Sequence, residues 1–336
     1  MGRTLVTGID IGRYSIKAVV LKPVKDTFAL VGYHEIPIEA DIFSDNHLLN
    51  YQKIVKKLKE LRKGLPLFSR KAALCVPDNA VISKVLQIDS ELSGSEREFA
   101  IFQAFSHQSP FPVEELNLDF VAIDPQAQRH ATASYQVFAT RKELVDSRVD
   151  ATSKAGFEPV LLDVQAYGLT QIWHEAARIQ QRKNWLLLDV GFTQASVCID
   201  VWDKPPLCKE FPVGTQSVIN HPSESLESGE QRFVREVMDK LQRHIQLVSS
   251  MSNREIEGVW LTGGAACDPQ LQVLLQDAVV NRLQLKFESL DPLALFLGAS
   301  KVQGASKGNK KPGFAFATAA GLALRGLQWM ENRHAA

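Results

Sequence analysis

The chain has 336 residues, of which 45% are hydrophobic and 23% are charged, a composition that excludes disordered and fibrous classes of protein. Its 38 basic and 38 acidic residues cancel, so no net field exists to hold nucleic acid or an anionic membrane surface. The length exceeds what one hydrophobic core usually supports, and we expect two domains, residues 1–180 and 181–336.

The first part of the chain predicts a sheet with a helix packed on it. Residues 5–21 form two apolar, β-branched stretches around a glycine-containing turn, which predicts a β-hairpin. Residues 48–61 have apolar side chains at helical spacing, with lysines between them. We interpret those lysines as the solvated face of an amphipathic helix and not as a phosphate site. Further strands are expected at 71–77 and 159–164.

A segment of about 80–158 predicts a β-α-β-β-α unit inserted within the first domain. Strands are expected at 81–88, 116–123 and 134–139. The first helix begins at the capping sequence Ser93-Gly-Ser-Glu96 and ends at Ser109-Pro110. A second helix, 142–155, ends at Gly156. We expect four aromatic side chains of this unit to be core residues: Phe99, Phe102, Phe105 and Phe111.

The second part of the chain repeats the opening pattern. An apolar strand at 185–191 leads into another hairpin, and a long helix and a buried strand follow. The expected elements are strands at 195–201, 206–211 and 258–262 and helices at 233–248 and 314–327. Loops are expected at 220–229 and 302–312, where polar and small residues replace the apolar period.

Targeting signals and metal-type cysteine patterns are missing from this sequence. The N-terminal residues lead into a patterned strand without the apolar segment of a signal peptide. No run approaches the roughly 18–20 consecutive apolar residues that cross a bilayer. The four cysteines, at 75, 198, 208 and 267, have no redox or zinc spacing. We therefore expect a cytoplasmic protein with reduced, buried cysteines, and any membrane role would be indirect.

The most informative feature is a repeated motif. Gly8-Ile-Asp-Ile-Gly12 and Leu187-Leu-Asp-Val-Gly191 each end a strand with Asp-x-Gly. An aspartate there can hold a hydrated divalent cation, and the glycine lets backbone approach phosphate closely. One such triplet is common in ordinary hairpin turns. Two copies, followed in order by Gly263-Gly264 between a strand and a helix, indicate a phosphate clamp and an adenosine loop.

With these motifs the chain resembles the actin-like ATPase superfamily, and within it the PilM family. PilM proteins are the actin-like cytoplasmic components of type IV pilus assembly. The stretches that carry the resemblance are Gly8-Ile-Asp-Ile-Gly12, Ser15-Ile-Lys17, Pro110 through Phe120, Ala139-Thr-Arg-Lys142, Asp146-Ser-Arg-Val149, Leu162-Asp-Val164 and Gly321-Leu-Ala-Leu-Arg325. Pro110 through Phe120 is the most specific of them, since no nucleotide-binding requirement explains it.

The resemblance implies an α/β fold, a two-lobed actin-like ATPase of ribonuclease H-like duplication. It also implies an inserted subdomain of the FtsA and PilM type at about 80–158. A groove beside this insert would hold the N-terminal cytoplasmic peptide of a PilN-like membrane protein, itself paired with a PilO-like protein. The chain would thereby be recruited peripherally to the inner membrane. The implied partner-binding residues are Pro110, Phe111, Pro112, Leu116 and Asn117.

The resemblance further implies ATP with Mg²⁺ as cofactor. The implied cofactor-binding residues are Asp10, Gly12, Arg13, Ser15, Lys17, Asp189, Gly191, Thr193, Gly214, Gly263 and Gly264. Asp10 and Asp189 would be the metal ligands. No residue is assigned a catalytic role.

Two departures from the family pattern weaken the cofactor expectation. Only a short loop follows Gly214, where the family has a helical subdomain that flanks the nucleoside, so the second lobe would lack this outer subdomain. Arg13 stands where the family has a small residue, and it could pair with phosphate or replace it. An open pocket binds less tightly, so we expect weakened or lost ATP binding, as in reduced relatives from DNA-uptake and competence systems.

Two other classes compete with an assembly role. A small-molecule kinase of the same superfamily would need a base beside an acceptor hydroxyl, and Asp163 is the one candidate. A chaperone-like ATPase would need a substrate-binding domain after the second lobe. The match to the PilM pattern and the missing nucleoside wall favour the assembly role. His107 and His244 are interpreted as packed or surface residues and not as ligands.

Overall fold

The computed structural model describes residues 4–43, 47–123, 131–201, 206–219, 227–252, 254–302 and 312–335. A first five-stranded sheet consists of β1 (Val6–Ile11), β2 (Ser15–Val24), β3 (Thr27–Pro37), β4 (Lys71–Val76) and β8 (Glu158–Val164). Its order is β3-β2-β1-β4-β8. The hairpin β1-β2 is antiparallel, with Asp10 opposite Lys17, and the predicted hairpin is confirmed.

A second sheet repeats this topology. It consists of β9 (Trp185–Val190), β10 (Ala195–Ile199), β11 (Leu207–Phe211), β12 (Gly258–Gly263) and β13 (Lys286–Ser289). The order β11-β10-β9-β12-β13 matches the first sheet strand for strand, with antiparallel hairpins and parallel β9-β12 and β12-β13 pairs. The repeated Asp-x-Gly motif therefore marks a duplicated supersecondary unit, and each copy lies at the end of the central strand pair.

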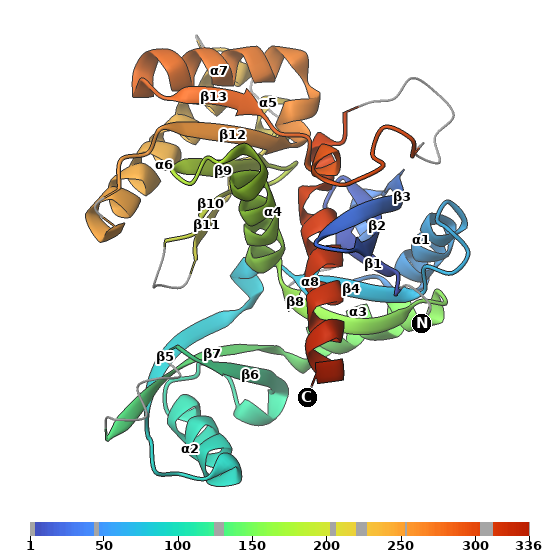
Figure 1. Cartoon of the computed structure of the whole chain (residues 1–336), viewed down its shortest axis with the longest axis vertical. Coiled ribbons are helices and arrows are strands. Elements are labelled where there is room, and N and C mark those ends of the chain that lie inside the picture. Colours follow the sequence, from blue (N-terminus) through green and yellow to red (C-terminus); the bar gives the residue numbers. More distant parts are fainter. Residues whose placement is uncertain are drawn as a thin grey trace.

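Helices cover both sheets (Figure 1). On the first sheet, α1 (Tyr51–Lys63) buries Ile54, Leu58 and Leu61 beside α3 (Lys142–Lys154). The Asn50 side chain caps α1 by accepting from the Lys53 N–H at 3.3 Å. The second sheet carries α6 (Gly229–Ser252) and α7 (Pro269–Leu283). The helix α6 buries Phe233, Val237 and Leu241 against the sheet, as the amphipathic period requires.

Two helices, α4 (Gln165–Gln180) and α8 (Ala317–Ala335), pack against each other between the sheets (Figure 1). Glycines allow the contact. A Cβ on Gly321 would lie 1.8 Å from the Gly168 carbonyl oxygen, and one on Gly8 would lie 1.9 Å from the Ala319 carbonyl oxygen. The helix α8 thus lies directly on β1, which fixes the position of the first Asp-x-Gly turn.

The inserted segment has its own sheet and core. Strands β5 (Ile82–Asp89), β6 (Leu116–Ala122) and β7 (Thr132–Arg141) form a sheet of order β5-β7-β6, covered on one face by α2 (Gly94–Ser106). The predicted capping box of Ser93 and Glu96 is present. Figure 1 shows this unit standing apart from the two larger sheets.

Several expectations about the insert and the cysteines were wrong. Phe105 is fully buried, whereas Phe99 is 70% exposed because α2 has a sheet on only one side; Phe111 is also exposed. The helix ends at Ser106 rather than at Ser109-Pro110. Cys198 and Cys208 form a disulfide, since the β10-β11 register places them opposite each other. Cys267 is exposed.

Two other expectations concern loops and membrane spans. The predicted loops at 220–229 and 302–312 fall mostly outside the described residues. Within the described part of the chain, no helix combines the length and the apolar character that crossing a bilayer would need.

Candidate functional site

A cleft of about 1690 Å³ lies between the two large sheets, where the β1-β2 and β9-β10 turns approach each other. All of the predicted cofactor residues line it except Gly214. That glycine instead lets the chain after β11 pack on the β9-β10 turn, because a Cβ there would lie 2.3 Å from the Phe192 carbonyl oxygen. The structure therefore brings together the sequence-distant motifs: Asp10, Gly12, Arg13, Ser15, Lys17, Asp189, Gly191, Thr193, Gly263 and Gly264.

The two Asp-x-Gly turns have the same backbone geometry. The Gly12 N–H donates to the Ser15 carbonyl at 3.1 Å, and the Gly191 N–H donates to the Gln194 carbonyl at 2.9 Å. A Cβ on Gly12 would lie 3.2 Å from the Ser15 carbonyl oxygen, and one on Gly191 would lie 3.1 Å from the Gln194 carbonyl oxygen. These are the oxygens that accept the hydrogen bonds of the two turns. Each glycine thus keeps its turn tight and leaves the backbone facing the cleft bare.

The third glycine motif closes one wall of the cleft. Gly263 has φ +88° and packs on β9, where a Cβ would lie 2.5 Å from the Val190 carbonyl oxygen. Gly264 faces more open space, because the nearest atom to a Cβ placed there would be the Val190 carbonyl oxygen, at 3.6 Å. The expected strand-to-helix turn is present, since a 3₁₀ turn at Gly264–Cys267 follows β12 and leads into α7.

The two aspartates differ in their electrostatics although the turns are alike. Asp10 lies opposite Lys17 in β2, and the Lys17 Nζ is 3.6 Å from the Asp10 Oδ2. Asp189 lies opposite Ser196 in β10, which brings no charge. Burial and the nearby charge of Asp10 raise the pKa of Asp189 to about 7, although Lys17 opposes this. Burial also raises the pKa of Asp10, outweighing the ion pair with Lys17.

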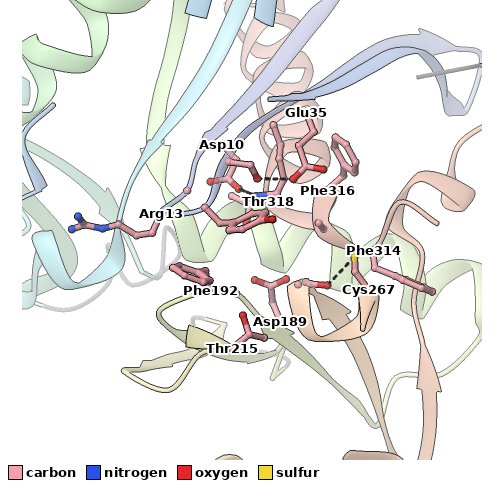
Figure 2. A pocket seen from close by; sticks show the side chains of 18 of the residues that line it. Asp10, Arg13, Glu35, Asp189, Phe192, Thr215, Cys267, Phe314, Phe316 and Thr318 are labelled. Atoms are coloured by element: carbon pink, nitrogen blue, oxygen red, sulfur yellow. Dashed lines mark hydrogen bonds and ion pairs between the residues drawn. The ribbon is translucent and has the colours of Figure 1, made fainter. Parts of the chain in front are cut away.

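An aromatic contact joins the two turns across the cleft. The rings of Tyr14 and Phe192 have centroids 5.4 Å apart, and Figure 2 shows Phe192 beside Asp189, below Asp10. The sequence interpretation missed this pair. Its signal is a large aromatic residue in each turn, where a phosphate loop needs small or hydroxyl residues.

Several groups expected to bind phosphate already have partners. The Ser15 hydroxyl donates to Glu35 Oε1 at 2.6 Å, and Lys17 pairs with Asp10. The Arg13 side chain points away from the two carboxylates (Figure 2), and its guanidinium lies 4.1 Å from the centre of the Phe43 ring. These contacts would have to break before a phosphate chain could lie along the first turn.

The residues present therefore do not fit a tightly held ATP with Mg²⁺. Asp10 and Asp189 supply two carboxylates, and in the described part of the chain no group of three or more histidine, cysteine, aspartate or glutamate residues could hold a metal ion. Mg²⁺ completes such a pair with water and phosphate oxygens. Phosphate oxygens would therefore have to displace the internal partners of Ser15 and Lys17.

Asp163, the one candidate for a kinase base, lies outside the cleft lining. Its Oδ2 accepts from Arg325 Nε at 2.7 Å, and its Oδ1 accepts from the Val164 N–H at 2.8 Å. Both carboxylate oxygens of Asp163 therefore already have partners, and neither faces the cleft where an acceptor hydroxyl would lie. Its role here is to connect β8 to α8.

The residues expected to bind a partner lie on the insert and do not line the cleft. Leu116 is buried at 3% exposure in the core of the insert, whereas Phe111 is 38% exposed. Pro110, Pro112 and Asn117 are exposed as well.

Comparison with known proteins decides the family. The model of a family described as type IV pilus assembly protein PilM matches residues 8–201, which include the first sheet, the insert and the second Asp-x-Gly turn. The chain belongs to the PilM family. The family predicted from the sequence motifs is thus confirmed, and so is the actin-like ATPase fold. The predicted reduction of the second lobe stays a prediction.

Solved structures agree with this assignment. A structure of a "PilM-PilN type IV pilus biogenesis complex" matches with 22% identity over 97% of this chain and 99% of that chain, with a TM-score of 0.75. At that identity the likeness shows the fold. The ethanolamine utilization protein EutJ from Carboxydothermus hydrogenoformans matches with 13% identity, 96% and 90% coverage and a TM-score of 0.47, and no argument rests on it.

Proposed function

We propose that this PilM-family protein is an actin-like assembly or scaffold component of a type IV pilus or DNA-uptake complex at the inner membrane. The observation that carries the proposal is the family match. In this proposal the protein is cytoplasmic and is recruited peripherally through a PilN-like membrane protein, with a PilO-like protein as an indirect partner. Turnover is not required, because the cleft groups that would contact phosphate bind one another.

The proposed site for the PilN-like N-terminal peptide is the surface of the insert around Phe111. Ser109 holds the Phe111 backbone from both sides: its hydroxyl donates to the Phe111 carbonyl at 2.7 Å and accepts from the Phe111 N–H at 3.2 Å. The Arg141 guanidinium lies 5.2 Å from the Phe111 ring centre. An exposed aromatic ring fixed in this way loses little conformational entropy on binding.

The neighbouring strand supports a peptide of extended conformation. Asn117 lies on β6, which is at the edge of the order β5-β7-β6. An edge strand offers backbone N–H and C=O groups to an added strand, while alternate side chains supply specificity. Phe111 and Asn117 would then contact the peptide, and Leu116 would support them from the core.

Replacing Phe111 with alanine is expected to weaken binding of the PilN-like N-terminal peptide about tenfold, because it removes a central aromatic anchor. Asn117→Ala should weaken binding less. Isothermal titration of the full chain with the synthetic peptide measures both. Phe68→Ala is the matched control, since Phe68 is 86% exposed on the turn between α1 and β4. Undiminished peptide binding by a folded Phe111→Ala protein would overturn the proposed site.

Titration with Mg-ATP tests the other half of the proposal. We expect little or no heat of binding, because Tyr14 and Phe192 contact each other between the two turns and the wall after Gly214 is short. The same protein sample should bind the PilN-like peptide. Tight nucleotide binding with turnover and no peptide binding would instead favour the small-molecule kinase reading.

A further inference from the structure

A buried arginine without a counter-charge lines one side of the cleft. Arg148, on α3, is only 3% exposed. Its Nη1 donates to the carbonyls of His47 and Leu144, both at 3.3 Å, and its Nε is buried with no hydrogen-bond partner. No carboxylate of the described residues is among the groups that influence its pKa, which burial and then Arg13 lower to about 10 despite the opposing effect of Cys75.

Two more basic side chains come from other elements and line the same side of the cleft. Arg13 Nη2 lies 3.3 Å from His47 Nδ1, and both residues also line an adjoining hollow of about 510 Å³. Burial and then the charges of Arg13 and Arg148 lower the pKa of His47. The two guanidinium charges repel each other, and an anion between them and the imidazole would relieve this repulsion.

An oxyanion would compensate the buried charge of Arg148. A buried guanidinium keeps its charge and is destabilising unless an anion or several acceptors compensate it. Two carbonyls at 3.3 Å compensate Arg148 only in part. Two guanidinium groups and an imidazole are a donor set that suits a tetrahedral oxyanion, because each guanidinium forks onto two oxygens.

We propose that Arg148, Arg13 and His47 form a binding site for a phosphate-type oxyanion, beside the Asp-x-Gly turns and separate from their carboxylates. This inference goes beyond the proposed assembly function and does not depend on peptide binding. The anion could be free phosphate or the phosphate of a nucleotide, since both present the same oxygens. Binding there would join the β1-β2 turn to α3 and to the segment before α1.

The test uses the full chain and inorganic phosphate, with chloride at equal ionic strength as the reference. Phosphate is expected to raise the unfolding temperature of the protein. The phosphorus NMR line of phosphate is expected to broaden in proportion to the protein concentration. Arg13→Gln, an exposed change that should fold normally, is expected to weaken the apparent affinity about tenfold. Arg148→Met should abolish the phosphate effect without lowering the unfolding temperature in chloride, because it removes an uncompensated charge.

Arg97→Gln is the matched control. Arg97, on α2 in the insert, also has a buried Nε without a hydrogen-bond partner, and its change should leave phosphate binding intact. Mg-ATP binding tighter than phosphate, weakened by the same Arg13 variant, would identify the nucleotide as the source of the anion; equal affinity would identify free phosphate. Equal stabilisation by phosphate and chloride, or equal loss in the Arg13 and Arg97 variants, would overturn the site.

Discussion

The Gly321→Ala variant is expected to lose about 3 kcal/mol of unfolding free energy, measured by urea denaturation. A Cβ on Gly321 would lie 1.8 Å from the Gly168 carbonyl oxygen and 3.0 Å from the Gly168 Cα. These are backbone atoms of α4, so no side-chain rotation relieves the clash. The two helices would have to separate. This separation would also disturb the packing of α8 on β1 and of α4 on the second sheet.

A second alanine variant separates this clash from a general effect of removing a glycine. Gly94 is the first residue of α2, and a Cβ there would meet no atom within 4 Å. Gly94→Ala should change stability by less than about 1 kcal/mol, and in the stabilising direction, since the unfolded chain loses freedom. Similar losses in the two variants would show that the α4-α8 contact does not need a glycine.

Much of the fold could be predicted because its signals are local. Apolar period, turn glycines and capping residues are read within a few positions of one another, and they predicted the hairpin at 5–21 and the helix beginning after Ser93. The Asp-x-Gly repeat went further, since it predicted that two distant turns would face one cleft. Repetition carries this information because a duplicated unit packs in the same way twice.

The parts that the sequence did not reveal depend on register and on long-range contact. The electrostatic surroundings of Asp189 differ from those of Asp10 because Ser196 and Lys17 occupy equivalent cross-strand positions. The Cys198–Cys208 bond likewise follows from the β10-β11 register. A one-residue shift would remove both features, and no local pattern specifies a register to that accuracy.

The exposure of aromatic side chains was also predicted wrongly. Phe99 has the spacing of a core residue, but α2 lies on the outside of a three-stranded sheet that covers only one of its faces. The Tyr14–Phe192 contact also escaped prediction, because the two rings meet only when both lobes are in place. Features of this kind decide whether a phosphate can enter, so the sequence motifs gave the position of the cleft and not its contents.

These contacts give the cleft a structural role that does not need a nucleotide. The Tyr14–Phe192 pair joins the two turns, and a second link lies at the sheet edge, where the Leu30 N–H donates to the Leu297 carbonyl and the Leu297 N–H donates to the Phe28 carbonyl, both at 3.0 Å. Two links at separate places restrict rotation of one lobe against the other. A scaffold benefits from such restriction, because a partner then meets one fixed surface.

We compare the unfolding free energy of the Asp189→Asn variant with that of the native chain at two pH values. The difference in favour of the variant is expected to grow by about 2 kcal/mol between pH 5 and pH 8. Burial raises the pKa of Asp189 from 3.8 to about 7, so between these values the folded chain holds a proton that the unfolded chain has lost. Native stability therefore falls as pH rises through this window. The expected free-energy difference is smaller than the full pKa shift would give, because solvent in the cleft partly reaches the Asp189 carboxylate.

The measurement is the difference between the pH curves of native and variant unfolding free energies. Burial also raises the pKa of Glu210 to about 7 and of Asp78 to about 6, and both contribute equally to native and variant proteins, so the difference isolates Asp189. Asp150→Asn, an exposed change on α3, is the matched control variant. Parallel curves for Asp189→Asn would mean that this carboxyl is ionised at neutral pH without cost.

The same experiment tests the proposed metal ligands. A Mg²⁺ ion held between Asp10 and Asp189 would lower the pKa of Asp189, and the native curve would become flat when the cation is added. We expect the slope to persist in millimolar Mg²⁺, because Lys17 already pairs with Asp10 and no phosphate is added to complete the coordination of the cation. Persistence of the slope together with peptide binding would support a cleft that joins the two lobes of this protein without a bound cation.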